Sequence, residues 1–188
     1  MQYSPSSRLT LIQVVLPQTG LLRDMLVVLA FSALIALSAQ VTIPLPFTPV
    51  PITGQTFAVL LTGATLGKVR GALSVGSYVG IGALGLPVFA RSGGPATWGY
   101  LAGFVLAAFV VGWLAERGWD KTLWRSIVAM LIGNVVLYIP GLLWLAQYVG
   151  PEQAIPLGLL PFLPGDAIKL LMAAAALPAC WVIVRRRS

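Results

Sequence analysis

Long apolar segments, separated by short polar or charged stretches, run through most of the chain. An α-helix needs about 20 mostly apolar residues to cross the hydrocarbon core of a bilayer. The pattern therefore predicts an all-α integral membrane protein with six transmembrane helices, over residues 21–39, 55–67, 70–87, 98–115, 124–147 and 157–184. We expect one membrane domain over 1–188, with an N-terminal segment (1–20), a six-helix bundle (21–184) and a basic tail (185–188). The first apolar segment shows no cleavage signal, so we interpret it as a membrane helix rather than a signal peptide.

A proline-rich stretch precedes the second predicted helix, which is short. Residues 43–51 read IPLPFTPVP, and four prolines in nine residues cannot continue a helix, because each lacks an N–H and clashes with the preceding turn. Non-helical backbone at membrane depth is tolerated only where protein or a water-lined cavity covers it. The stretch is therefore either an outer loop or part of a pocket wall.

Composition supports a membrane environment. Hydrophobic residues make up 58% of the chain and charged residues only 9%, whereas a soluble domain carries about 25% charged residues. The net charge of +7 does not indicate a nucleic-acid partner, because the positive residues lie at the ends of apolar segments rather than on one basic face. We interpret them as topology signals and as contacts to anionic lipid headgroups.

The distribution of Lys and Arg predicts the orientation in the membrane. Six crossings with both termini cytoplasmic put ten of the twelve Lys and Arg residues inside: Arg8, Arg23, Lys68, Arg70, Arg117, Lys121, Arg125, Arg185, Arg186 and Arg187. Arg91 falls in the outer loop between the third and fourth helices, and Lys169 falls within the last helix. This distribution agrees with the positive-inside rule. Five or seven helices would break the alternation of sides on which the agreement depends. We expect a multi-pass protein of the plasma membrane.

Two charges, Asp166 and Lys169, fall inside the membrane region, where ionisable residues are costly and therefore mark candidate functional sites. Pro164 and Gly165 predict a break before the last helix resumes, with Asp166 in its first turn, where the helix dipole favours a carboxylate. Lys169 lies three residues on, hence on the same face. The pair is either a plain intrahelical ion pair or part of a site for a ligand that offers both N–H and C=O groups.

Other polar and aromatic residues are candidates for the same outer site: Gln55, Arg91, Thr97, Trp98, Tyr100, Tyr78 and Asn134. Tyr and Trp near helix ends are often interfacial belt residues instead, and an Asn can simply bond a neighbouring helix. In the first helix, Ser32, Ala36 and Ala39 form a face of small residues. This face serves either packing within the bundle or docking of a partner protein.

The sequence contains few residues suited to catalysis. The chain has no histidine and one cysteine, Cys180, so we expect no metal site and no cofactor. No phosphate-binding loop of the form G-x-x-x-x-G-K-[ST] occurs, so ATP hydrolysis by that route is excluded. No Ser/His/Asp arrangement or carboxylate pair exists for catalysis. The sequence favours a binding or transport subunit over an enzyme.

Several motifs resemble the biotin transporter BioY family. PITGQT (51–56) is similar to the family's V-P-x-T-x-Q-T opening, and LLTG (60–63), GAL (71–73), GALGLPVFA (82–90) and GYL (99–101) continue the likeness. LPFLPGD (160–166) with Lys169 resembles the signature P-F-L-P-G-D-x-x-K. The likeness covers about residues 25–176, although the loop at 90–98 is shorter than the family's usual glycine-rich stretch.

The resemblance implies the six-helix S component of an energy-coupling factor (ECF) transporter, which binds biotin for import. A transmembrane coupling protein and ABC-type ATPases are the implied partners. It also implies that Asp166 and Lys169 contact biotin, that Arg91 meets its carboxylate at the pocket mouth, and that the small-residue face docks on the coupling protein. The alternatives are an S component for another vitamin, a small membrane enzyme acting on lipid, and a purely structural subunit.

Overall fold

The computed structural model describes residues 9–17 and 20–185. Arg8, Arg186 and Arg187, which the charge argument assigns to the cytoplasmic side, lie outside the described residues. The elements are, in chain order, α1 (Leu11–Val15), α2 (Leu21–Gln40), β1 (Thr42–Ile43), β2 (Ile52–Thr53), α3 (Gln55–Leu66), α4 (Lys68–Ala83), the 3₁₀ turn η2 (Pro95–Thr97), α5 (Trp98–Ala115), α6 (Leu123–Val149), α7 (Pro151–Gly158) and α8 (Leu163–Arg185).

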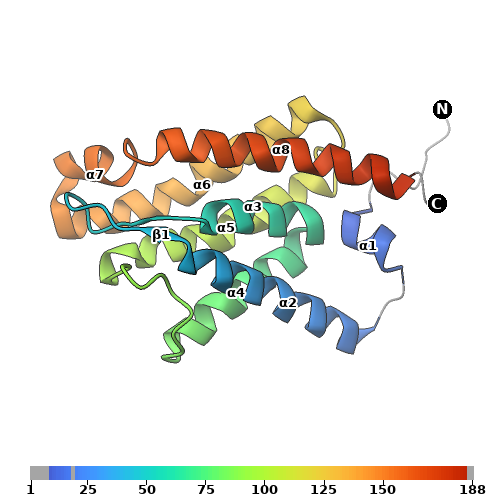
Figure 1. Ribbon diagram of the computed structural model, residues 1–188, viewed down its shortest axis with the longest axis horizontal. Helices are drawn as coiled ribbons and strands as arrows, with labels where there is room; N and C mark the ends of the chain where they lie inside the picture. The colour runs from blue at the N-terminus through green and yellow to red at the C-terminus, as the bar shows by residue number, and fades with distance from the viewer. Residues whose placement is uncertain (1–8, 18–19, 186–188) are drawn as a thin grey trace.

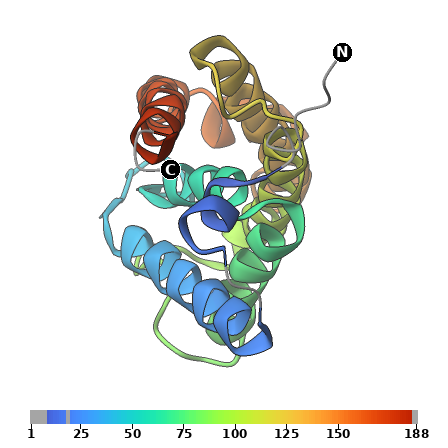
Figure 2. The same ribbon diagram turned by 90° about the vertical axis from the view of Figure 1, so that its right-hand side faces the viewer.

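The longer helices form a bundle along the long axis of the molecule (Figure 1). The α3–α4 and α5–α6 connections lie at one end, on the right of Figure 1. The β-hairpin, α7 and the α4–α5 connection lie at the other end. Viewed along the axis, α2 lies at the edge of the bundle, with α3 between it and α8 (Figure 2).

Four of the predicted helices, 21–39, 55–67, 98–115 and 124–147, agree with α2, α3, α5 and α6 to within two residues. The helix predicted at 70–87 is instead α4, which begins at Lys68 and ends at Ala83. It ends there because Gly85 adopts a positive φ of 94°, a conformation outside the helical region.

The helix predicted at 157–184 is wrong at its beginning. Residues 151–158 form a separate helix, α7, and α8 begins only at Leu163. Pro164 and Gly165 lie in the first turn of α8 rather than before it. A proline costs little there, because the first N–H groups of a helix have no intrahelical acceptor. Asp166 does lie in the first turn, as predicted, and its backbone N–H donates to the carbonyl of Phe162 at 2.8 Å.

The short helix α1 and the hairpin were not predicted. Thr42 pairs with Thr53 and Ile43 with Ile52, so the prolines lie in the connecting loop, where no strand N–H is required. Within that loop, the Thr48 hydroxyl donates to the carbonyl of Leu157 at 2.8 Å, which fixes the loop against α7.

Helix α5 lies at the centre of the bundle, and glycines bring its neighbours close. A Cβ on Gly103 of α5 would lie 2.3 Å from the carbonyl oxygen of Leu137 in α6. A Cβ on Gly63 of α3 would lie 2.5 Å from the carbonyl oxygen of Ala108. Such contacts are typical of membrane helices that pack through small residues.

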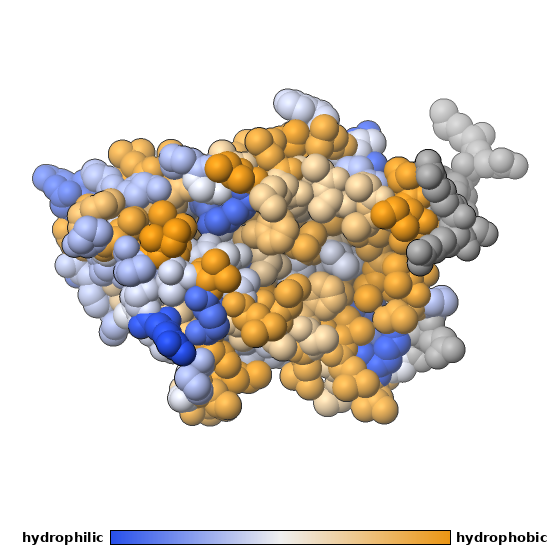
Figure 3. All heavy atoms as spheres, in the orientation of Figure 1, coloured by the Kyte–Doolittle hydropathy of each residue, from blue (hydrophilic) through white to orange (hydrophobic). Residues whose placement is uncertain are grey.

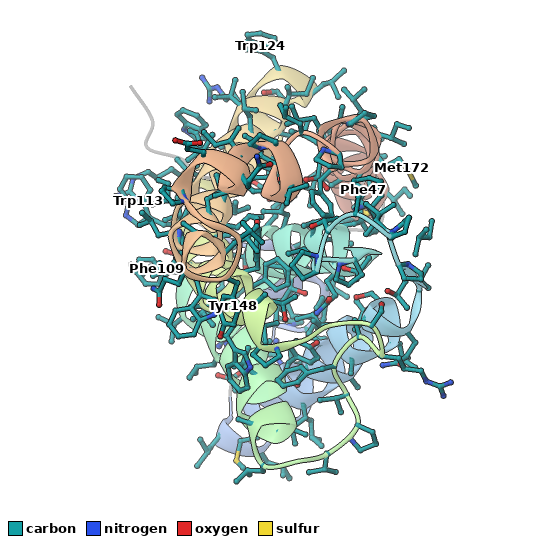
Figure 4. The ribbon with its side chains drawn as sticks, turned by 90° about the vertical axis from the view of Figure 1, so that its left-hand side faces the viewer. Phe47, Phe109, Trp113, Trp124, Tyr148 and Met172 are labelled. Atoms are coloured by element: carbon teal, nitrogen blue, oxygen red, sulfur yellow. The ribbon has the colours of Figure 1, made fainter. Side chains whose placement is uncertain are left out.

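Within the described residues, four helices are long and apolar enough to cross a membrane: Leu21–Gln40, Pro95–Ala115, Leu123–Val149 and Leu163–Val184. The outer surface carries broad areas of hydrophobic side chains (Figure 3). Phe109, Trp113, Trp124 and Met172 all point outward from the bundle (Figure 4) and are more than a third exposed. Apolar surface of this extent requires lipid as its solvent, so the protein is a multi-pass membrane protein.

Candidate functional site

A cavity of about 250 Å³ opens at the end of the bundle that carries the hairpin and α7. Segments distant in sequence form its walls: the proline-rich loop with β2, the beginning of α3, the α4–α5 connection, and parts of α4, α5, α6 and α8. The lining residues are Val50, Pro51, Thr53, Gln55, Thr56, Tyr78, Phe89, Ala90, Gly93, Gly94, Pro95, Thr97, Trp98, Tyr100, Leu101, Phe104, Leu137, Tyr138, Phe162, Asp166 and Lys169. Val50 and Pro51, at the end of the proline-rich stretch, form part of the pocket wall, and the residues before them form the connecting loop of the hairpin.

Asp166 lies in the cavity wall with only 6% of its side chain exposed. Its Oδ1 is 3.2 Å from the Lys169 ammonium and accepts a hydrogen bond from the Thr56 hydroxyl at 3.3 Å. Its Oδ2 accepts a hydrogen bond from the Tyr138 hydroxyl. Lys169 also donates to the Thr56 oxygen at 3.1 Å. A buried charge is tolerated only when it is paired and hydrogen-bonded, and these donors meet that condition.

A second group of polar side chains comes from the beginning of α3 and from α4. The Gln55 amide nitrogen donates to the Tyr78 hydroxyl at 2.7 Å, and the Thr53 hydroxyl donates to the Gln55 amide oxygen at 3.1 Å. Gln55 and Tyr78 are 5% and 1% exposed. The two groups adjoin because Gln55 and Thr56 are consecutive residues at the first turn of α3. They offer a ligand both donors and acceptors.

Aromatic rings supply much of the remaining wall. Phe89 contacts Tyr78 and Trp98 edge-to-face, with ring centroids 5.5 and 5.7 Å apart. Tyr100 and Tyr138 form a further edge-to-face pair at 6.1 Å. Such walls suit a flat or fused-ring apolar body, while the polar groups fix its orientation.

The cavity gathers most of the residues singled out in the sequence: Asp166, Lys169, Gln55, Tyr78, Tyr100, Thr97 and Trp98. Tyr100 has its hydroxyl directed away, donating to the carbonyl of Gly158 at 2.9 Å. Arg91 is exposed and outside the lining, although it lies between the lining residues Ala90 and Gly93. Asn134 is buried in α6 outside the lining, and its carbonyl oxygen has no hydrogen-bond partner.

On α2, the small residues face the bundle. Ser32 and Ala39 are buried, and Ala36 packs against the core. This arrangement agrees with the packing interpretation. A shallow hollow of about 370 Å³ also lies along the same face, between α2 and α4, and it is lined by Ser32 and Ala36.

Sequence reasoning did not assign a role in the site to Thr56 or Tyr138. Thr56 is separated from Asp166 by 110 positions and Tyr138 by 28. A single hydroxyl in an apolar helix carries no signal of such a contact.

No cluster of three or more His, Cys, Asp or Glu side chains suited to a metal ion occurs in the part of the chain that the structure describes. The acidic residue of the cavity is paired with a lysine and two hydroxyls. The arrangement is equipped to hold an uncharged polar group carried on an apolar body.

Comparison with known proteins gives consistent results. The family model described as the BioY family matches residues 7–186. "Biotin transporter BioY" of Thermotoga maritima is 44% identical over 151 residues, covering 77% of this chain and 87% of that protein. "Biotin transporter BioY" of Rhizobium etli is 39% identical over 168 residues, covering 81% and 89%. A crystal structure described as the S-component for biotin from an ECF-type ABC transporter matches with a TM-score of 0.70 and 26% identity, over 88% of this chain and 90% of that one.

Proposed function

Because this chain belongs to the BioY family, we propose that it binds biotin in the cavity beside Asp166 and serves as the S component of an ECF transporter. Its role is capture of the vitamin for import and not catalysis. The whole chain then acts as a single membrane domain.

The observation that carries this proposal is the pair formed by buried Asp166 and half-buried Lys169 in a cavity that is walled in part by aromatic rings. Biotin has a fused, mostly apolar ring system and a ureido group with two N–H donors and one C=O acceptor. Asp166 accepts from a ureido N–H, and Lys169 donates to the ureido oxygen. Hydrogen bonds to charged groups are the stronger kind, and each contributes about 1.5–3 kcal/mol.

The other cavity residues complete the site in this proposal. Gln55 and Tyr78 add neutral polar contacts, and Tyr100 supplies an apolar ring face. Arg91, exposed at the mouth, is suited to the carboxylate of the valerate chain, which extends toward water. A carboxylate and a guanidinium form a favourable pair at such a boundary.

Import requires energy from other subunits, because the chain carries no phosphate-binding loop. We propose a transmembrane coupling protein and ABC-type ATPases as partners, consistent with the description of the similar crystal structure as part of an ECF-type ABC transporter. Ser32 and Ala39 are buried against the bundle, so the docking surface that we propose on α2 is limited to the shallow hollow between α2 and α4, which Ser32 and Ala36 line and where small side chains allow close approach of another helix.

We further propose that six helices cross the membrane, with α3 and α4 added to the four long apolar ones, and that both termini are cytoplasmic. At 12 residues α3 is about 18 Å long, too short for a lipid-exposed span. Eight of its residues are buried, however, so its backbone is covered by protein rather than by lipid. The Lys and Arg residues near the α3–α4 and α5–α6 connections lie at one end of the bundle, in agreement with the positive-inside rule.

The first test is isothermal titration of the detergent-purified chain with biotin, beside Asp166→Asn, Lys169→Met and the double variant. We expect one-to-one binding by the unaltered chain. Each single substitution should weaken it by about 10- to 100-fold, because one charge-assisted hydrogen bond is lost. Glu152→Gln is the matched control: it removes an exposed carboxylate from α7 at the same end of the bundle and should leave the affinity unchanged.

Folding of each variant is checked by size-exclusion chromatography and thermal unfolding. Absence of biotin binding by the folded, unaltered chain would overturn biotin as ligand, and competition with other vitamins would then identify the alternative. Full affinity in the folded double variant would instead show that the pair is only an intrahelical ion pair.

A further inference from the structure

The shallow hollow of about 370 Å³ between α2 and α4 opens toward the membrane. Two leucines of α2 line it, Leu29 and Leu37, and they are 49% and 69% exposed. The α2 residues of the hollow lie between positions 29 and 37, well inside the apolar span Leu21–Gln40. In a bilayer the hollow is therefore at the depth of the hydrocarbon, and acyl chains cover it until a partner docks there.

Tyr78 lines both this hollow and the proposed biotin cavity, and among the residues that the structure describes no other is shared by the two linings. Its side chain is enclosed between the two spaces, because the residue is only 1% exposed. The α4–α5 connection divides at the same place: Pro87 and Val88 line the hollow, whereas Phe89 and Ala90 line the cavity. At Tyr78 a single side chain therefore separates the cavity from lipid.

Contacts on the cavity side hold the Tyr78 ring in place. Its hydroxyl accepts from the Gln55 amide nitrogen at 2.7 Å, and its ring contacts Phe89 edge-to-face with centroids 5.5 Å apart. Phe89 lies close over Gly82 of α4, where an added Cβ would be 2.3 Å from the Phe89 ring. A tyrosine suits this position, because it presents a rigid apolar ring to the lipid side and a hydroxyl to the polar side.

Without this side chain the cavity would be suited to a hydrocarbon chain. Leu101, Phe104 and Leu137 make part of its lining apolar. Apolar cavities that are created by removing a side chain bind small apolar molecules. Lipid chains are always next to the hollow, while a vitamin is dilute, so even weak entry of a chain would reduce the fraction of cavities available to biotin.

We propose that Tyr78 is a specificity-determining residue that keeps the alkyl chains of the membrane out of the ligand cavity. The proposal rests on the proposed function only in taking this cavity as the biotin site, since the separation itself follows from the two linings. Replacing the ring by a methyl group would join the hollow to the cavity, whereas phenylalanine would keep the two spaces apart.

Photolabelling tests the separation without any need for biotin. The unaltered chain, Tyr78→Ala and Tyr78→Phe are reconstituted in vesicles of a phosphatidylcholine with a diazirine at the end of one acyl chain. Labelled residues are then identified by mass spectrometry. In Tyr78→Ala we expect labelling of the cavity residues Leu101, Phe104 and Leu137, which are at most 6% exposed. The unaltered chain and Tyr78→Phe should show none at these positions.

Two further measurements identify the labelled space as the cavity. Saturating biotin should suppress the cavity labelling in Tyr78→Ala. In titration calorimetry, the apparent dissociation constant for biotin should rise in proportion to added decanol in Tyr78→Ala and should not depend on decanol in Tyr78→Phe. Phe109→Ala is the matched control: it removes an outward-pointing ring from α5 and should leave the cavity unlabelled.

Cavity labelling in the unaltered chain or in Tyr78→Phe, or its absence in folded Tyr78→Ala, would overturn the proposal. If Tyr78→Ala does not fold, Tyr78→Leu takes its place, because leucine keeps more of the packing but still removes the ring. Absence of cavity labelling in that variant overturns the proposal equally. Failure of the unaltered chain to bind biotin would overturn the proposed function alone, because the labelling is measured without ligand.

Discussion

Asp166 receives its donors from three helices: Thr56 from α3, Tyr138 from α6 and Lys169 from α8. The carboxylate is thus held in one place before any ligand arrives. Positioned polar groups in a low-dielectric site bind more strongly than mobile ones, because no further ordering is needed on binding. Thr56 has a double role, since its hydroxyl donates to Asp166 and accepts from Lys169.

At this scale we predict that Tyr138→Phe weakens biotin binding by about tenfold, because one hydrogen bond to the buried carboxylate is lost while the ring is kept. Titration calorimetry measures the change. Tyr148→Phe is the matched control: it makes the same chemical change on the same helix at an exposed side chain, and its affinity should equal that of the unaltered chain. Equal affinities in both variants would show that Tyr138 does not position Asp166.

Individual residues also show what a sequence can reveal about a site. Asp166 and Lys169 stand out because charges are rare in apolar segments, and their proximity follows from a spacing of three in a helix. Arg91 stands out equally by charge but lies outside the cavity lining, because its position depends on the path of an irregular loop. Thr56 and Tyr138 bear no charge, so only the tertiary structure reveals their contact with Asp166.

Among the elements, α2, α5 and α6 were predictable because apolar length alone defines a membrane helix. The boundary between α7 and α8 was not, because residues 157–163 are apolar throughout and Pro164 permits either an end or a beginning. Packing determines where α7 ends. A Cβ on Gly158 would lie 2.4 Å from the Tyr100 hydroxyl, and the Gly158 carbonyl accepts a hydrogen bond from that hydroxyl. The hairpin could not be predicted either, because each of its strands has only two residues, too few to show an alternating pattern of apolar and polar positions.

The contact between α5 and α6 gives a prediction about stability. Gly103→Ala should destabilise the protein by about 1–3 kcal/mol, because the new Cβ would lie 2.3 Å from the Leu137 carbonyl oxygen and force the helices apart. Thermal unfolding of the detergent-solubilised chain measures the effect. Gly80→Ala on α4 is the control, since its Cβ meets nothing within 4 Å and its stability should be unchanged or slightly raised. Equal stabilities in the two variants would contradict this account of helix packing.

The molecule as a whole has two ends of different character. The end with the hairpin and α7 holds the proposed biotin cavity, and the other end holds the α3–α4 and α5–α6 connections with their basic residues. The sequence predicted this asymmetry from charge alone. The proposed biotin cavity could be predicted only in part, because its wall combines segments that only the complete fold brings together.

Cysteine accessibility tests the orientation. In a Cys180→Ala background, a cysteine at Ser92 in the α4–α5 connection should react with a membrane-impermeant maleimide on intact cells. A cysteine at Thr122 in the α5–α6 connection should react only after permeabilisation, because six crossings with cytoplasmic termini put it inside. Both positions are exposed in the structure. The reverse labelling pattern would invert the proposed topology.

The contact between Thr56 and Lys169 joins residues 113 positions apart, so α8, at the C-terminal end of the described chain, closes the site that α3 begins. A ribosome-bound chain that has not yet inserted α8 therefore lacks Asp166 and Lys169 of the proposed site, and on this proposal biotin does not assist the earlier stages of assembly. Once α8 is inserted, the vitamin binds only the finished structure and stabilises it in proportion to its concentration. Nutrient supply would thus prolong the lifetime of completed molecules and leave unfinished ones to degradation.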